Sequence, residues 1–346
     1  MMNYDLYKKM AYRDVAQRLK DRYPDAEISE KRVTKENAIY DCISFHMDSG
    51  EDNIEISPSL YLNVMYDSYC NTGDYEASLE DAIKLFESNQ VDRQEAQNML
   101  ENVEKAFGDV ENHIFFQLLN KEANREMLFE CPHIIPPGME DLAIIFRIEI
   151  KRSEGGIQSV RVTNKDLERG RVSGSPDELF KMALKSTPIQ DPVTVTRLRD
   201  VQEIMTYNFV NPDDYHDMDD IRKSIDELDE LADPEDILII SNKSGICGAG
   251  SILYEGVLDK LEEKAGGGLY ILPSSRHEVL VMPMKGNDLD TIACIVSEVN
   301  MSAVRVEDRL SYNVYKYEGK TLSIAHDSKN RDIRAVKLEG FNRDCR

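Results

Sequence analysis

The chain has 346 residues, of which 41% are hydrophobic and 31% are charged, so it can form two lobes with their own cores and needs no metal or disulfide to fold. Its 65 acidic side chains outnumber its 42 basic ones and give a net charge of −23. This charge argues against nucleic acids and anionic membranes as partners, because binding to either depends on lysine and arginine. We therefore expect a protein or a small molecule as the partner.

The cysteines and the first residues of the chain predict a cytoplasmic protein. No two cysteines have C-x-x-C spacing; they are Cys42, Cys70, Cys131, Cys247, Cys294 and Cys345. This spacing favours free thiols in a reducing compartment over a disulfide framework. The first ten residues include Asp5, Lys8 and Lys9, so they lack the apolar region of a signal peptide. Apolar stretches such as 237–240 are far too short to span a membrane.

The first 108 residues predict a lobe of helices around one hairpin. Residues 5–21 predict a helix with its apolar side chains at helical spacing in Tyr7, Met10, Ala11, Val15 and Leu19. Alternation over 39–47 predicts a half-buried strand, which a polar turn connects to a second strand through Ile54 and Ile56. Three helices follow. We interpret 1–108 as the N-terminal lobe.

Residues 109–325 predict a second lobe that mixes strands and helices. A strand at 114–118 opens it, and the segments 142–150 and 157–162 form a hairpin around two glycines. The run Ser175-Pro176-Asp177-Glu178 predicts a helix start, because serine can cap the amide three residues on and the glutamate can reciprocate.

The end of this lobe is predicted to be rich in strands. A strand at 236–241 is expected to pair with 246–253, and two further strands at 269–272 and 279–282 flank a short turn. Residues 326–346 predict a frayed tail. The fold class is therefore α+β, with two lobes, mainly antiparallel or mixed sheets, and flanking helices.

The stretch from Asp200 to Asp236 carries about half of the net charge. It holds 14 acidic residues against two basic ones, Arg222 and Lys223. A solvated helix with one docked face is predicted inside it, with apolar positions at Ile221, Ile225, Leu228 and Leu231.

Two glycine motifs resemble phosphate-binding sequences without meeting their requirements. Gly319-Lys320-Thr321 matches the end of a phosphate-binding loop, but that loop needs a glycine where this chain has Val314. Gly245, Gly248 and Gly250 follow an apolar strand in G-x-x-G-x-G order, which is the reverse of dinucleotide-binding spacing. We expect no nucleotide cofactor.

The histidines show no metal-binding pattern. His277-Glu278 begins like a zinc-peptidase motif, but Val281 stands where the second histidine is required. The six histidines are scattered over the chain. We expect no metal site.

One region, 242–278, gathers side chains that could perform nucleophilic catalysis. Cys247 or Ser274 could act as a nucleophile, His277 as its base, and Glu278 or Asn242 could orient the base. A ligand held there would be contacted by Asn242, Ser275 and Arg276. The alternative interpretation is that these residues form turns, that the histidine is a cross-strand neighbour and that the thiol is buried.

Four stretches of the sequence together point to a known family: Ile56–Leu62, Arg161–Asn164, Gly248–Leu258 and Tyr270–Val279. Through them the chain resembles an uncharacterised Firmicutes family, domain of unknown function 5688. Within the third stretch Glu255 stands where proline is expected. The resemblance implies a cytoplasmic protein and brings no activity, substrate or catalytic residue.

Two hypotheses about function follow. The leading one is a non-enzymatic binding or protein-interaction protein, because the cofactor, metal and nucleophile motifs considered above are missing from the sequence. The alternative is a hydrolase or transferase that uses the Cys/Ser-His site within 242–278.

Overall fold

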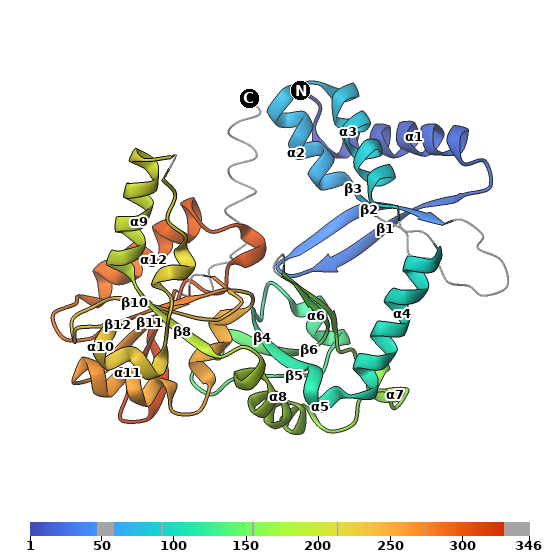
Figure 1. Ribbon diagram of the computed structural model, residues 1–346. Helices are drawn as coiled ribbons and strands as arrows, with labels where there is room; N and C mark the ends of the chain where they lie inside the picture. Colours follow the sequence, from blue (N-terminus) through green and yellow to red (C-terminus); the bar gives the residue numbers. More distant parts are fainter. Residues whose placement is uncertain (47–58, 91–92, 154–155, 213, 274, 329–346) are drawn as a thin grey trace. The chain divides into compact units, whose positions relative to one another are not determined.

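The computed structural model shows two compact units that meet in sequence between Lys105 and Ala106 (Figure 1). The predicted lobe boundary lay after residue 108. The structure describes residues 1–46, 59–90, 93–153, 156–212, 214–273 and 275–328. Most of the predicted tail at 326–346 therefore lies outside the described residues.

The first unit combines helices with one small antiparallel sheet in the strand order β1-β2-β3. Its elements are α1 (Tyr4–Arg22), β1 (Glu27–Lys35), β2 (Ala38–His46), β3 (Leu60–Tyr61), α2 (Leu62–Thr72), α3 (Tyr75–Ser88) and α4 (Arg93–Gly108), the last of which crosses the boundary. The predicted helix at 5–21 is confirmed as α1, and the predicted strand at 39–47 as β2. The predicted strand through Ile54 and Ile56 lies outside the described residues.

The strand that pairs with β2 was not predicted. It is β1, which runs antiparallel to β2 along its whole length. The sequence of β1, EISEKRVTK, offers few apolar side chains, and most of the strand is exposed or half-buried. The pairing of β1 with the more buried strand β2 holds β1 in place. The alternation of apolar and polar residues in β1 is too weak to predict a strand from the sequence.

The core of the first unit is rich in tyrosine. Four residues of the predicted stripe of α1 are buried against α2 and α3, namely Tyr7, Ala11, Val15 and Leu19, whereas Met10 is half-buried. The Tyr7 ring stacks on Tyr69 with centroids 5.3 Å apart, and its hydroxyl lies 2.8 Å from Ser78 Oγ. A buried phenol needs such a partner, because an unpaired hydroxyl in an apolar core is costly.

One carboxylate, Asp41 on β2, ties the sheet to α1. Lys8 Nζ lies 2.9 Å from Asp41 Oδ1, and Tyr4 donates its hydroxyl to Oδ2 at 2.9 Å. Burial opposes the charge of this carboxylate, but the hydrogen bonds from Lys8 and Tyr4 outweigh burial, so the pKa of Asp41 lies below its ordinary value of 3.8. The folded state therefore binds the proton less tightly than the unfolded state does.

Replacing Asp41 with asparagine should destabilise the first unit in a pH-dependent way. Because the folded pKa is lowered, the contribution of the carboxylate is present above pH 3.8 and is lost as the pH falls through the folded value. Asp41→Asn should lower the free energy of unfolding by about 1–3 kcal/mol at pH 7, and the difference should shrink in strong acid. Calorimetric unfolding over a pH series measures it. Asp25→Asn, at an exposed position, is the control; an equal loss at pH 7 and pH 2.5 would contradict this account.

The second unit contains two antiparallel sheets. The larger has the strand order β14-β13-β11-β12-β10-β8-β9, and in the smaller β6 pairs with β4, β5 and β7. The strands are β4 (Ile114–Asn120), β5 (His133–Ile134), β6 (Leu142–Ser153), β7 (Gly156–Arg161), β8 (Val193–Arg197), β9 (Lys223–Ser224), β10 (Leu238–Asn242), β11 (Leu269–Leu272), β12 (Val279–Pro283), β13 (Val314–Glu318) and β14 (Thr321–His326).

Helices and short turns connect these strands. The helices are α5 (Val110–His113), α6 (Arg125–Glu130), α7 (Asn164–Glu168), α8 (Pro176–Gln190), α9 (Leu198–Val210), α10 (Leu228–Leu231), α11 (Val257–Ala265) and α12 (Leu289–Ser302). The 3-10 turns are η1 (Met218–Ile221), η2 (Ile225–Glu227), η3 (Gly248–Leu253) and η4 (Val306–Asp308). The architecture is α+β, as predicted.

Several predicted elements of the second unit are confirmed. The hairpin of β6 and β7 forms, with Ser153 paired to Gly156, and β11 pairs with β12. Ser175 caps α8, with its side chain accepting from the Glu178 amide and Glu178 reaching back to the Ser175 amide.

Two predicted elements are wrong. Residues 246–253 do not pair with β10; they form η3, and the neighbours of β10 are β8 and β12. The predicted helix through Ile221 and Leu231 is instead η1, β9, η2 and α10 in succession. Ser224 starts a new turn with its own capping box with Glu227, and β9 pairs with β8, so the helix cannot run through.

The two sheets of the second unit are joined by a buried polar cluster. Asp141, just before β6, accepts from Ser311 Oγ at 2.5 Å and from Tyr315 hydroxyl at 2.6 Å. Asn120, at the end of β4, donates to the Leu310 carbonyl at 2.8 Å. Burial and the neighbouring Asp141 raise the pKa of Tyr315, so this phenol stays protonated and donates at physiological pH.

Candidate functional site

The turn between β11 and β12 lies against the loop that follows β10, and the His277 side chain of the turn contacts the backbone of that loop. Its Nδ1 lies 3.3 Å from the Cys247 amide nitrogen and 3.2 Å from the Gly245 carbonyl oxygen. Its Nε2 lies 3.2 Å from Asp308 Oδ1 and 3.2 Å from Arg276 Nε. Both ring nitrogens therefore already have partners.

This arrangement makes His277 a tether between two loops. A general base needs a ring nitrogen directed at the proton that it removes. Here Nδ1 faces the Gly245 carbonyl and the Cys247 amide, and Nε2 faces the Asp308 carboxylate. The contact between Cys247 and His277 that the structure describes is through the backbone amide of the cysteine.

Gly248 explains why the loop can approach the sheet so closely. A Cβ atom at this position would lie 2.3 Å from Ser241 Oγ and 2.6 Å from the His277 carbonyl oxygen. Only glycine fits there. Ser241 donates its hydroxyl to that carbonyl at 2.7 Å, so the strand, the loop and the turn meet at one point.

The other predicted site residues differ in their surroundings. Ser274 lies outside the described residues. Ser275 Oγ accepts from the His277 amide at 3.0 Å, and Arg276 Nε donates to Asp308 at 2.9 Å, so both stabilise the turn. Glu278 is exposed. Asn242 is buried at the end of β10 and donates to the Ile246 carbonyl at 2.8 Å.

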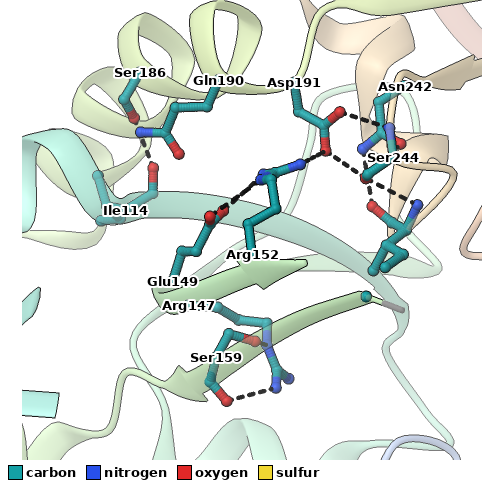
Figure 2. A network of polar contacts seen from close by, with 12 residues as sticks. Ile114, Arg147, Glu149, Arg152, Ser159, Ser186, Gln190, Asp191, Asn242 and Ser244 are labelled. Carbon is teal, nitrogen blue, oxygen red and sulfur yellow. Dashed lines mark hydrogen bonds and ion pairs between the residues drawn. The ribbon is translucent and has the colours of Figure 1, made fainter. Parts of the chain in front are cut away.

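A second polar centre, which sequence reasoning missed, lies around Asp191 at the end of α8 (Figure 2). Its side chain is only 4% exposed. Arg152 from β6 donates to Oδ2 at 3.1 Å, and Ser244 donates its amide to Oδ1 at 2.8 Å and its hydroxyl to Oδ2. Glu149 holds the far side of the Arg152 guanidinium with two hydrogen bonds.

Electrostatics favour the charged form of this network. Burial lowers the tendency of Arg152 to be charged, but the hydrogen bonds with Glu149 and Asp191 outweigh burial and raise its pKa. Tyr254 donates its hydroxyl to the Asp191 carbonyl at 3.3 Å. The network therefore connects β6, the end of α8 and the loop after β10 without leaving a free charge.

A small cavity adjoins the Asp191 network. Asn242 and Cys247 contribute to its wall together with Arg152, Asp191 and Tyr254. Its volume is about 10 Å³, which is room for about one water molecule. Two predicted site residues thus share a cavity, and His277 does not line it.

A third feature is the exposed surface of α9, which stands out from the large sheet in Figure 1. No residue of this helix, all of which the structure describes, is buried. Phe209 is 89% exposed, and other large apolar side chains are exposed beside it. We define the α9 surface as Met205, Phe209, Val210 and Tyr215.

The loop after α9 is pinned to the helix. Asn208 and His216 exchange two hydrogen bonds of 2.9 Å, from the Asn208 side-chain nitrogen to the His216 carbonyl and from the His216 amide to Asn208 Oδ1. The Tyr207 ring contacts His216 edge-on at 4.6 Å, and its hydroxyl donates to Asp214. These contacts hold Asp214 and His216 against α9, most of which lies within the acidic stretch from Asp200 to Asp236.

The described residues can also be compared with the requirements of metal sites and membrane-spanning helices. No group of three or more His, Cys, Asp or Glu side chains there is placed to hold a metal ion. Nor does any helix within the described ranges have both the length and the apolar character needed to cross a membrane.

The fold and these sites define an α+β protein in which His277 connects two loops and the α9 surface exposes large apolar side chains. The chain belongs to the family of unknown function DUF5688, whose model matches residues 4–319. No curated protein and no solved structure is significantly similar to it.

Removing the His277 ring should destabilise the second unit, because groups on both sides of the ring would lose a hydrogen-bond partner. In any one tautomer Nδ1 pairs with either the Cys247 amide or the Gly245 carbonyl, and Nε2 pairs with either Asp308 or Arg276. His277→Ala should lower the free energy of unfolding by about 2 kcal/mol. A double-mutant cycle with Asp308→Ala should show a coupling of about 0.5–3 kcal/mol, since the two side chains are in contact. Chemical denaturation measures both. An unchanged midpoint in His277→Ala would refute the tether.

Proposed function

We propose that this chain is a non-enzymatic protein-interaction protein that binds its partner through the α9 surface. The observation that carries the proposal is the set of large exposed apolar side chains on α9, a helix with no buried residue: Met205, Phe209 and Val210, with Tyr215 also exposed in the loop after it. Aromatic and methionine side chains are enriched at the centres of protein interfaces, and few of them supply most of the binding energy.

The rigidity of the α9 surface supports this proposal. Ordering flexible residues on binding costs free energy. Asn208 and Tyr207 already hold His216 and Asp214 in the unbound protein, so less free energy is lost when a partner binds. Met205 and Phe209 are four residues apart, so they are neighbours on one side of the helix. A partner can therefore seat both side chains in one apolar pocket.

The charge around this surface indicates the chemistry of the partner. The stretch from Asp200 to Asp236 has 14 acidic and two basic residues. A partner with a basic rim around an apolar pocket would be attracted, and a second copy of this chain would be repelled. We therefore infer a different, basic protein as the partner.

We place the protein in the cytoplasm of a Firmicutes bacterium. The five cysteines in the described part of the chain are free thiols, which fits a reducing compartment. The family resemblance supports the same assignment.

The hydrolase or transferase alternative has less support. It requires His277 to activate Cys247 or Ser274, whereas both ring nitrogens of His277 are engaged by backbone, Asp308 and Arg276. The adjoining cavity has room for about one water and would have to open to admit a substrate.

Shortening Phe209 should weaken the complex. Phe209→Ala should reduce affinity at least tenfold, as expected for a central apolar anchor. Alanine leaves the charge unchanged, so the effect reports the apolar contact. The wild type and variant are immobilised, partners are enriched from a lysate of the source organism, and the affinity of each identified partner is measured by titration calorimetry.

The chain offers a matched control for this experiment. Phe129 is 86% exposed at a different place, on α6, so Phe129→Ala should leave binding unchanged. Both variants should keep the stability of the wild type to within about 0.5 kcal/mol. Equal losses in both variants would count against the α9 surface. Turnover of a hydrolase substrate that disappears in Cys247→Ala, with no partner retained, would favour the enzyme alternative instead.

A further inference from the structure

One face of the small sheet holds a buried amide group with an unpaired donor. Gln117 on β4 is fully buried, with 0% exposure, and its Nε2 has no hydrogen-bond partner among the described residues. Its Oε1 accepts from Arg147 at 3.5 Å. A buried N–H group without an acceptor costs about 1–3 kcal/mol, and such a group in a native protein calls for a bound water or ion.

Two arginines lie beside this amide. Arg147 on β6 and Arg161 on β7 are directly opposite each other in the antiparallel ladder, and Gln117 pairs with Ile145, two residues before Arg147. The three side chains therefore leave the sheet on the same face. Like charges placed opposite each other across two strands repel.

Arg161 is the second unpaired donor. Its Nε is buried and, in the described part of the structure, has no hydrogen-bond partner. Nearby carboxylates are engaged elsewhere, because Glu149 holds Arg152 and Asp166 pairs with Arg171 at 3.3 Å. Arg147 by contrast is held by Ser159, with Nε donating to Oγ at 3.0 Å (Figure 2).

Charged groups of both signs lie near the interior next to this face. Burial raises the pKa of the Cys131 thiol; the Arg161 and Arg147 guanidinium groups oppose that rise, and the Glu130 and Asp166 carboxylates add to it. Cys131 packs with Leu119 and Ile145 in the apolar cluster on this side of the sheet. Positive charge and unpaired donors thus meet at the edge of an apolar surface, where water screens charge poorly.

We propose that Gln117, Arg147 and Arg161 form a binding site for the oxyanion group of a small molecule, either a phosphate or a carboxylate. Such an anion would accept from Gln117 Nε2 and from the Arg161 guanidinium, and it would neutralise the repulsion between the two arginines. The planar guanidinium matches two oxygens of either group. This site is independent of the α9 surface.

Thermal unfolding of the full chain with inorganic phosphate, with succinate and with sodium chloride at matched ionic strength tests the proposal. Phosphate or succinate should raise the midpoint in a saturable way, and the more effective of the two identifies the class of ligand. Arg161→Gln should weaken the apparent affinity at least fivefold. Arg125→Gln removes the same charge from an exposed arginine paired with Glu122 and should bind as the wild type does.

Gln117→Met separates binding from folding. Removing the unpaired donor should leave the ligand-free protein as stable as the wild type or more stable, and should abolish the stabilisation by the anion. The proposal fails if neither anion gives a saturable shift, if Arg161→Gln and Arg125→Gln respond alike, or if Gln117→Met keeps the full shift.

Discussion

The buried carboxylate of Asp191 is the interaction on which the second unit depends most. It lies directly after α8 and accepts hydrogen bonds from Arg152 of the small sheet and from Ser244 in the loop that follows β10. Since β10 belongs to the large sheet, the Asp191 side chain connects the end of α8 with both the small and the large sheet. The Asp191 side chain is 4% exposed and that of Arg152 is 33% exposed, so losing the arginine would leave a buried carboxylate with one partner fewer, which is destabilising. The position of the loop that carries Cys247 follows from this contact.

That loop determines what the second unit can do. It is held from one side by the Asp191 network and from the other by His277, and Gly248 lets it pack against β10 without a gap. His277 and Asn242, which were candidates for catalysis, therefore hold this loop in place. The α9 surface has the opposite character, since large apolar side chains stay exposed there. The exposed apolar side chains of α9 are the basis of our proposal that this chain binds another protein.

Much of the fold could be predicted from sequence, because local signals were strong. The stripe of α1 and the capping box before α8 each encode their element in a few neighbouring residues. The prediction was wrong for 246–253, which is apolar enough for a strand. Its true conformation is set by contacts distant in sequence, with Ser241, His277 and Phe116 crowding its glycines. β1 was missed for the same reason, since its pairing with β2 outweighs its weak pattern.

The candidate site was predictable only in part. Asn242 and Cys247 do share a cavity, yet their neighbours Arg152 and Asp191 lie 90 and 51 residues before Asn242 in the sequence, and no motif links them. The unpaired donors of Gln117 and Arg161 are likewise visible only in three dimensions, because they depend on the register of three strands. The exposed side chains of α9 look like core residues in sequence, because helical spacing alone does not show whether an apolar side chain is covered.

Cross-linking from α9 in living cells tests the central claim most directly. A photoreactive phenylalanine analogue at position 205, where Met205 is 60% exposed, is compared with the same analogue at position 129. The account predicts a covalent adduct with a different protein, joined at a segment rich in lysine and arginine, from position 205 but not from position 129. Adducts that form equally from both positions, or only with a second copy of this chain, would contradict it.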